Sequence, residues 1–388
     1  HEYGSHYEKE VAHPGYYSNM LTKYNIKTEV TATPRTGLSR FTFPKGQGNI
    51  LLNLGEGLTN ETGATVRFVS DTEIEGSKLM GTFCYNPQAV FPIYFVMQVN
   101  KAPKEKGYWK KQREMKGVEA QWDADAGKYK LYTKYTREIS GDDVGVWFKY
   151  DVAEQEQIEV KIGVSFVSIE NARENLKAEQ PGFEFDKIAS AARDKWNDDL
   201  SRITVEGGTK DEKTIFYTGL YHLLIHPNIL QDVNGEYPKM ESLEVGKTSG
   251  NRYTVFSLWD TYRNVSSLMT LLYPDRQLDI IQTMIDMYKE NGWLPKWELY
   301  GRETFTMEGD PSIPYIVDAW MKGLRDFDTT TAYEAMRKGA TTPGEFNLLR
   351  PDANDYFSLG YVPLREQYDN SVSHALEYYL ADWNLSQF

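Results

Sequence analysis

The hydrophobic period of this chain changes near residues 165 to 205, and this change constrains the fold more than any other feature. Before it, apolar and polar residues alternate with period 2, as they do in half-buried strands. The alternating segments are separated by Gly, Asp and Asn turns and include Ile26–Thr33, Arg40–Phe43, Phe91–Val99, Val146–Val152 and Ile158–Ser168. Many short strands joined by turns predict an antiparallel β-sandwich over residues 1–168.

Helical periods replace this alternation from Asn171 onward. Residues 169–205 carry charged, alanine-containing helical patterns that are interrupted at Pro181 and Gly182, and we interpret them as a helical linker. Residues 206–388 continue as a succession of helices. The sequence therefore predicts three parts, which are a sandwich, a linker and a helical domain.

The best-defined helix of the last part is predicted to open at Pro274 and to end at Gly292, because proline suits the first helical turn and glycine the position after the last. It carries two apolar stripes, one of Leu278, Ile281, Ile285 and Tyr288 and one of Ile280, Met284 and Met287. Two stripes predict packing on two sides. A second helix start is predicted from a capping box at Thr331 to Glu334.

The overall charge and hydropathy exclude two classes of partner. The 43 Lys and Arg face 56 Asp and Glu, and a net charge of -13 without a basic run argues against binding to nucleic acid. No apolar run reaches the roughly 20 residues that are needed to cross a bilayer. Aromatic residues make up 14% of the chain, which suits contact with carbohydrate but also suits a large sandwich core.

A sugar-binding site is predicted in the segment Gly292–Thr304, which reads GWLPKWELYGRET. Trp293 and Trp297 offer aromatic faces on which pyranose rings stack. A carboxyl group near such rings has its charged form disfavoured and its pKa raised, as a proton donor at neutral pH requires. We therefore predict that Glu303 is a general acid. The alternative is a structural carboxylate paired with a basic residue of the same segment.

A second candidate segment, Phe256–Leu268, reads FSLWDTYRNVSSL. If it is helical, Asp260, Arg263 and Asn264 fall at i, i+3 and i+4 and share one face. A carboxylate, a guanidinium and an amide on one face could grip a polyol. The alternative is an Asp260 that stabilises the helix start and forms an ion pair with Arg263.

Several longer strings resemble glycoside hydrolase family 92, the calcium-dependent, inverting, exo-acting α-mannosidases. They occur in one order through most of the chain and are Pro14–Leu21, Thr31–Pro44, Lys161–Leu176, Phe216–Tyr237 and Ser371–Trp383, together with the two segments above. The resemblance implies an α+β multidomain chain, with an N-terminal antiparallel β-sandwich, a helical linker and the first part of an (α/α)6 toroid. It also implies hydrolysis of terminal α-mannosidic bonds of mannose-containing glycans.

The resemblance assigns roles to particular residues. The family's general acid, the Glu of a Gly-Asn-Glu-Thr motif, corresponds to Glu303 in Gly301–Thr304, where Arg302 replaces the Asn. The family's sugar-gripping Trp-Asp pair corresponds to Trp259 and Asp260. We expect further hydroxyl contacts from arginine, a pocket shaped by tryptophan and a lysine near the leaving sugar. The predicted substrate-binding residues are Trp259, Asp260, Arg263, Trp293, Lys296 and Trp297.

The chain departs from the family pattern in two places. It reads MEGDPSIPY at Met307–Tyr315, where many members have a Gly-aromatic-His step, so the resemblance predicts no linkage preference. The general base and the ligands of the calcium cofactor are expected beyond Phe388. Only about half of the helices of a toroid follow residue 205. The apolar pattern of Leu376, Tyr379, Leu380 and Trp383 also runs on to the last residue, so we expect a fragment of a longer protein.

Other functions remain open at this point. A polysaccharide lyase or a glycosyl phosphorylase could use the same sandwich-plus-toroid architecture, although the net charge of -13 disfavours an anionic polymer. A noncatalytic glycan-binding protein would fit a chain that lacks the base. The resemblance implies a bacterial periplasmic, cell-surface or secreted location, and the oligomeric state is not predicted.

Overall fold

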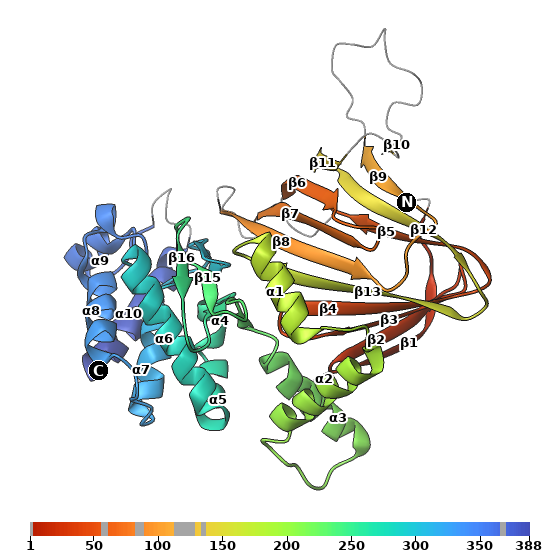
Figure 1. The fold of residues 1–388 in the computed structure, drawn as a ribbon. Helices are drawn as coiled ribbons and strands as arrows, with labels where there is room; N and C mark the ends of the chain where they lie inside the picture. Colours follow the sequence, from red (N-terminus) through yellow and green to blue (C-terminus); the bar gives the residue numbers. More distant parts are fainter. Residues whose placement is uncertain (1–2, 56–60, 82–88, 112–128, 133–136, 365–369) are drawn as a thin grey trace. The chain divides into compact units, whose positions relative to one another are not determined.

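The computed structural model describes residues 3–55, 61–81, 89–111, 129–132, 137–364 and 370–388 (Figure 1). The chain divides into two compact units. The first holds all the long strands, two helices and the short segment Asp232–Asn234, and the second holds the remaining helices with several very short strands. An antiparallel sheet domain followed by a helical domain confirms the predicted fold class.

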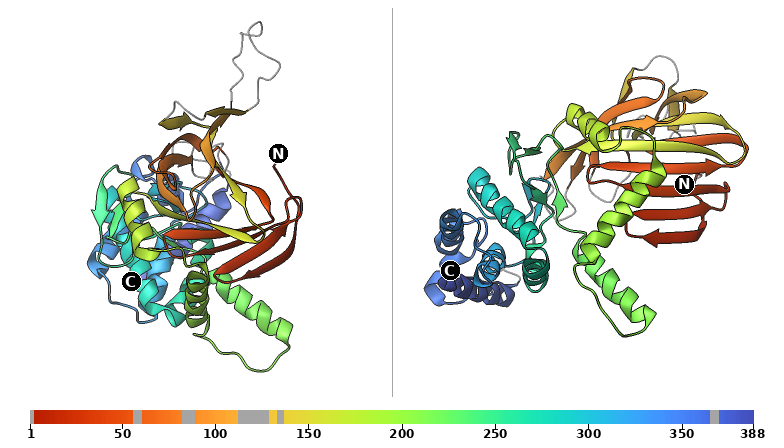
Figure 2. Two further views of the ribbon diagram at one scale, coloured as in Figure 1. Left: turned by 45° about the vertical axis from the view of Figure 1, so that its right-hand side comes forward. Right: turned by 60° about the horizontal axis from the view of Figure 1, so that its bottom comes forward.

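Two antiparallel sheets form the first unit. Among the described residues the larger sheet has nine strands, in the order β1 (Tyr7–His13), β2 (Tyr16–Leu21), β3 (Ile26–Ala32), β4 (Thr36–Phe43), β13 (Glu156–Ser165), β8 (Val90–Val99), β7 (Glu73–Gly81), β6 (Glu61–Phe68) and β11 (Glu138–Gly141). The smaller has four, in the order β10 (Tyr129–Tyr132), β9 (Glu105–Lys111), β12 (Val144–Val152) and β5 (Gly46–Asn53). The right-hand view of Figure 2 shows the strands of the larger sheet in succession.

Alternating burial explains why these segments form a sandwich. Every second residue of β12 is buried, namely Val144, Val146, Phe148, Tyr150 and Val152. They share one apolar core with residues of the larger sheet such as Val66 and Ile158. Each fully buried side chain of this size contributes about 1.5–3 kcal/mol, so the period-2 pattern directly stabilises the two-sheet arrangement.

Two helices follow the sandwich strands in the first unit. Helix α1 spans Ile169–Glu179 and α2 spans Phe185–Leu200, and the break between them contains Pro181 and Gly182, as predicted. Proline lacks the N–H that a continuing helix needs. Helix α1 packs on the larger sheet through a small apolar cluster of Val96, Ala172 and Leu176.

The second unit is built mainly of helices. They are α3 (Lys210–Leu223), α4 (Leu258–Thr261), α5 (Val265–Leu272), α6 (Pro274–Asn291), α7 (Ser312–Met321), α8 (Thr329–Thr341), α9 (Ala353–Leu359) and α10 (Ser371–Gln387). The short strands pair as β14 (Asn228–Ile229) with β17 (Tyr253–Thr254), β15 (Glu236–Pro238) with β16 (Val245–Lys247), and β18 (Glu298–Leu299) with β19 (Arg302–Glu303). No helix in the described part of the chain is both long and apolar enough to cross a bilayer.

Helix α6 confirms its predicted boundaries and its two-sided burial. It begins at Pro274 and ends before Gly292, whose φ of 84° is the left-handed conformation that glycine adopts freely. Its buried apolar residues are Ile280, Ile281, Met284, Ile285 and Met287. The predicted capping box of α8 is wrong, because Asp328 caps the helix by accepting the N–H of Thr331. An aspartate one turn earlier competes successfully for the cap.

Helix α10 leaves an apolar face exposed, as its sequence pattern predicts. The side chains of Val372, Leu376 and Trp383 are 72%, 60% and 59% exposed. On its other side, Tyr378 and Ala381 are buried. The helix therefore packs through one side and leaves apolar side chains exposed on the other.

Candidate functional site

The predicted acid, Glu303, lies on a tight hairpin of the second unit. Glu298 and Glu303 are directly opposite each other in the β18–β19 pair, and the loop between the strands centres on Tyr300 and Gly301. Both loop residues have left-handed φ angles, 53° and 81°, as a two-residue hairpin loop of type I′ requires. The hairpin places the two glutamates side by side across the strands.

Backbone amides hold the carboxylate of Glu303. Its Oε1 accepts the N–H groups of Trp297 and Phe305 at 2.8 and 2.9 Å, and its Oε2 accepts the N–H of Lys296 at 2.8 Å. The side chain is buried, and burial raises the pKa of Glu303, although the three N–H donors and the Lys296 ammonium act to lower it. The structure thus brings Glu303, Lys296 and Trp297 together.

A loop between β15 and β16 supports the hairpin from another side. The N–H of Glu303 donates to Glu241 Oε1 at 2.6 Å, and the N–H of Glu241 donates to the carbonyl oxygen of Gly301 at 2.9 Å. Arg302 forms an ion pair with the same Glu241, at 3.6 Å. The path of the Glu303 backbone is therefore fixed on both sides of the residue.

Lys296 is buried beside several carboxylates that the sequence did not reveal. Burial lowers the pKa of its ammonium, whereas Glu303, Asp310 and Asp352 act to raise it. Asp310 is buried as well, and burial raises its pKa. The arrangement links the predicted acid to a buried group of charges.

This buried group continues toward α9 and α10. Arg350 lies between Asp310 and Asp382, at 3.5 and 2.8 Å. Asp352 accepts the hydroxyl of Tyr378 at 2.6 Å and lies 3.4 Å from His374. The paired residues are 22 to 40 positions apart in the chain, so only tertiary folding brings them together. Asp310 within the unusual MEGDPSIPY string was the one available signal in the sequence.

The second predicted segment is not one continuous helix, so the predicted shared face of Asp260, Arg263 and Asn264 is wrong. Helix α4 ends at Thr261, and Asn264 is the N-cap of α5 with φ of -148°. Asp260 accepts the hydroxyl of Ser257. The alternative reading, an Asp260–Arg263 ion pair, is replaced by a pairing of Arg263 elsewhere.

Arg263 pairs with α10. Its guanidinium lies 2.5 Å from Glu377 and also covers the ring of Trp259, at 4.9 Å from the ring centre. Tyr262 donates its hydroxyl to the same Glu377 at 2.8 Å. The turn between α4 and α5 is thus tied to α10, and Trp259 is held by Arg263.

The remaining predicted residue, Trp293, lies at the end of α6. The ammonium of Lys338 from α8 lies 4.5 Å from its ring centre and donates to the carbonyl oxygen of Gly292 at 2.7 Å. These contacts stabilise the helix end. The predicted role of Trp293 in binding sugar stays a prediction.

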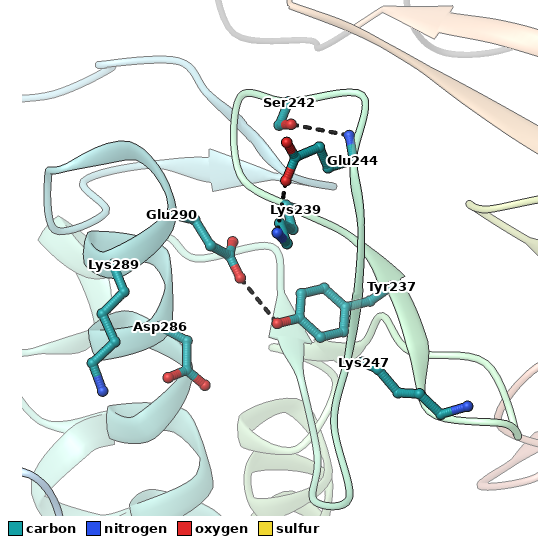
Figure 3. Close-up of a pocket in the computed structure, with 8 residues that line it drawn as sticks. All are labelled: Tyr237, Lys239, Ser242, Glu244, Lys247, Asp286, Lys289 and Glu290. Atoms are coloured by element: carbon teal, nitrogen blue, oxygen red, sulfur yellow. Dashed lines mark hydrogen bonds and ion pairs between the residues drawn. The ribbon is translucent and has the colours of Figure 1, made fainter.

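A polar groove of the second unit lies elsewhere. It has a volume of about 510 Å³ and is lined by Tyr237, Lys239, Ser242, Glu244, Lys247, Asp286, Lys289 and Glu290 (Figure 3). Tyr237 donates to Glu290 at 2.9 Å, and Lys239 pairs with Glu244 at 2.7 Å. None of the predicted substrate-binding residues lines this groove.

The described residues do not supply a calcium site. Within the described ranges, no three or more His, Cys, Asp or Glu side chains lie together in a way that could hold a metal ion. Calcium prefers six to eight oxygen ligands, about 2.3–2.6 Å away, so the described residues do not fit this cofactor by themselves. The calcium ligands, which are expected beyond Phe388, stay a prediction.

The chain matches known proteins along nearly its whole length. Residues 1–165 match the glycosyl hydrolase family 92 N-terminal domain, and residues 171–388 match the glycosyl hydrolase family 92 catalytic domain. The chain is also 27% identical over 243 residues to an uncharacterized secreted glycosidase of Arthroderma benhamiae, in an alignment that covers 58% of this chain and 27% of that protein.

Solved structures give the same result. A family GH92 α-mannosidase from Bacteroides thetaiotaomicron, which was also solved in complex with mannoimidazole, superimposes with a TM-score of 0.85 at 29% identity and covers 99% of this chain and 49% of that one. An inverting GH92 mannosidase from the same organism superimposes with a TM-score of 0.84 at 26% sequence identity. That match covers 99% of this chain and 49% of the other. This chain therefore spans about half the length of these structures. Because both domain matches together cover almost every residue, the chain belongs to glycosyl hydrolase family 92.

Proposed function

We propose that the protein containing this chain is an exo-acting α-mannosidase that hydrolyses terminal α-mannosidic bonds of glycans with inversion. The family assignment and the α-mannosidase structures at 29% and 26% identity support this proposal. The observation that carries it is the buried Glu303, which is fixed by three backbone N–H groups at the position where the sequence predicts a general acid.

In this proposal Glu303 donates a proton to the glycosidic oxygen. Its Oε1 accepts two N–H bonds, which use both lone pairs of that oxygen, so we assign the transferable proton to Oε2. Burial raises the pKa of Glu303, which favours the protonated form that a general acid needs. A water would attack the anomeric carbon from the opposite face, activated by a second carboxylate about 6.5–9.5 Å from the acid.

The substrate would be held by aromatic and charged groups of the second unit. Trp259 and Trp297 would pack on sugar rings, and Arg263 and Asp260 would hydrogen-bond hydroxyl groups. Lys296, whose backbone already contacts Glu303, would lie toward the leaving sugar. These residues come from the two segments that the sequence singled out.

Calcium and location are further parts of the proposal. The calcium cofactor is proposed on the family resemblance alone, since the described residues form no group that could hold a metal ion. A secreted relative supports a location outside the cytoplasm, and the periplasm of a bacterium or the cell surface would suit the degradation of N-glycans.

The proposal is tested on the protein at its natural length. We expect release of mannose from α-mannosides, first as the β-anomer in a time-resolved NMR spectrum. The reaction should need neither phosphate nor a uronic acid and should give no unsaturated product, in contrast to a phosphorylase or a lyase. Initial α-mannose would overturn inversion, and binding without turnover would favour a glycan-binding protein.

Calcium is tested separately by chelation. Loss of activity in EDTA, restored by added calcium and matched by calcium in elemental analysis, would support the cofactor. Unchanged activity in EDTA, with no calcium in the protein, would overturn it without affecting the assignment of Glu303.

A further inference from the structure

Glu298 is the most deeply buried carboxylate of the hairpin, and both of its carboxylate oxygens accept hydrogen bonds. Its side chain is 0% exposed. The N–H of Gly301 donates to Oε1 at 2.5 Å, and the N–H of Val255 donates to Oε2 at 3.1 Å. The hydroxyl of Thr254 lies 2.9 and 3.1 Å from the two oxygens. Burying a carboxylate costs free energy unless hydrogen bonds compensate for the lost water, and these donors supply that compensation.

Thr254 connects this carboxylate to the hairpin loop. Its hydroxyl oxygen also accepts the N–H of Tyr300 at 2.7 Å. Tyr300 has a left-handed φ of 53°, which an L-residue rarely adopts without support. Glu298 and Thr254 therefore hold both loop residues, Tyr300 and Gly301, from one side, while the N–H of Phe256 fixes the carbonyl oxygen of Glu298 at 2.9 Å.

We propose that Glu298 is a positioning residue, which acts through Thr254 and the Tyr300–Gly301 loop to hold Glu303 in its place for proton transfer. This inference rests on the proposed role of Glu303 as the general acid. Glu298 itself does not touch the substrate in this proposal. It sets the conformation of the loop, and the loop sets the direction from which the strand of Glu303 returns.

The two oxygens of Glu298 accept different backbone donors, and this explains why glutamate is needed. A glutamine has one acceptor oxygen, and its amide group would face either the N–H of Gly301 or the N–H of Val255. One buried N–H would lose its partner in either orientation. The isosteric substitution is therefore expected to loosen the loop without changing its size.

The test compares Glu298→Gln and Thr254→Val with Glu303→Gln on two aryl α-mannosides, one with a poor and one with an activated leaving group. A misplaced proton donor slows mainly the substrate that needs protonation. We expect a loss in kcat of about 10- to 100-fold on the poor leaving group for Glu298→Gln, with KM unchanged, because misplacement by about 1 Å costs this much. On the substrate with the activated leaving group we expect a loss in kcat of less than about threefold.

The Thr254 variants and a surface control complete the design. Thr254→Val should show the same dependence on the leaving group, and Thr254→Ser, which keeps the hydroxyl, should lose less than Thr254→Val. Glu334→Gln, on the exposed side of α8, is the matched control and should not change activity.

The possible outcomes separate the inference from the proposed function. If Glu303→Gln shows the leaving-group dependence but Glu298→Gln and Thr254→Val slow both substrates equally, with lower melting temperatures, Glu298 is only structural and the inference is overturned. If Glu303→Gln itself lacks this dependence, the assigned acid is wrong and the inference fails with it. If Glu298→Gln does not fold, Thr254→Val alone decides between these results.

Discussion

The two segments predicted to form the site are held in different ways. Glu303 is buried and receives N–H bonds from Lys296, Trp297 and Phe305, so main-chain atoms define its position. Arg263 is exposed and is oriented by a side-chain pair with Glu377 of α10. Main-chain contacts are fixed by the local path of the chain, whereas the second arrangement depends on a helix more than a hundred residues away.

This difference matches the different roles that we propose for the two segments. A proton donor must be held within a fraction of an ångström of its target, and a buried carboxylate on backbone donors meets that need. Groups that grip hydroxyls can stay at the surface and adapt, because a sugar offers several donors and acceptors. We therefore expect chemistry to depend on the Glu303 segment and affinity on the Arg263 segment.

The largest expected effect is that of Glu303→Gln, which tests the rigid side of the comparison. The amide would face the N–H of Lys296, or the two N–H groups at Oε1, so stability should fall as well as activity. General acid catalysis accounts for about 10²–10⁴-fold, and this loss in kcat should appear on poor leaving groups only. Equal losses on poor and activated aryl mannosides would remove Glu303 from the mechanism and leave Glu298 to be tested as the acid.

Lys296→Met should have the next largest effect. It removes a buried ammonium that lies beside Glu303, Asp310 and Asp352, and we expect a loss of about 3–5 kcal/mol in the free energy of unfolding, measured with urea. The ammonium also acts to lower the pKa of Glu303, so its removal should move the basic limb of the kcat/KM pH profile to higher pH. A shift to lower pH would contradict the electrostatic role. Lys322→Met, at the exposed C-cap of α7, serves as the control.

The pH dependence of stability should identify Glu298. Burial raises its pKa from 4.5 to about 7, while Gly301, Thr254 and Arg252 act to lower it and Glu303 adds to the rise. A carboxyl with a raised folded-state pKa stabilises the fold fully below pH 4.5, and this contribution is lost as the pH rises through about 7. The stability of wild type relative to Glu298→Gln should therefore fall by about 3 kcal/mol over this range. A difference that is constant from pH 4 to 8 would show that Glu298 does not titrate there.

Much of the fold could be predicted from the sequence because its signals are local. The period-2 segments became strands of the sandwich, and Pro274 and Gly292 marked the ends of α6. The break between α4 and α5 was missed because no Pro or Gly marks it. Tyr262 and Arg263 at this break contact the distant Glu377. Tertiary contacts override helical periodicity at such points.

A candidate site could be singled out from the sequence, but its geometry could not. The segment around Glu303 stood out by its residue types, yet strands of two residues leave no readable period, and Tyr300 is not a residue that signals a left-handed turn. The buried charges Asp310, Arg350 and Asp352 were missed because charged residues are expected at the surface. Their pairing depends on segments that only the folded chain brings together.

The smallest expected effect tests the adaptable side of the comparison, through Glu377→Gln. The pair with Arg263 is half exposed, with side-chain exposures of 44% and 12%, so its loss should cost no more than about 1 kcal/mol of stability. If Arg263 holds a sugar hydroxyl, the released guanidinium should bind substrate less well, and KM should rise about three- to tenfold with kcat unchanged. In an Arg263→Gln background the same substitution should add nothing to KM, because Glu377 acts through Arg263. Additive effects of the two substitutions, or a fall in kcat equal to that of Glu298→Gln, would show instead that α10 shapes the reaction centre and that the two segments do not divide the work.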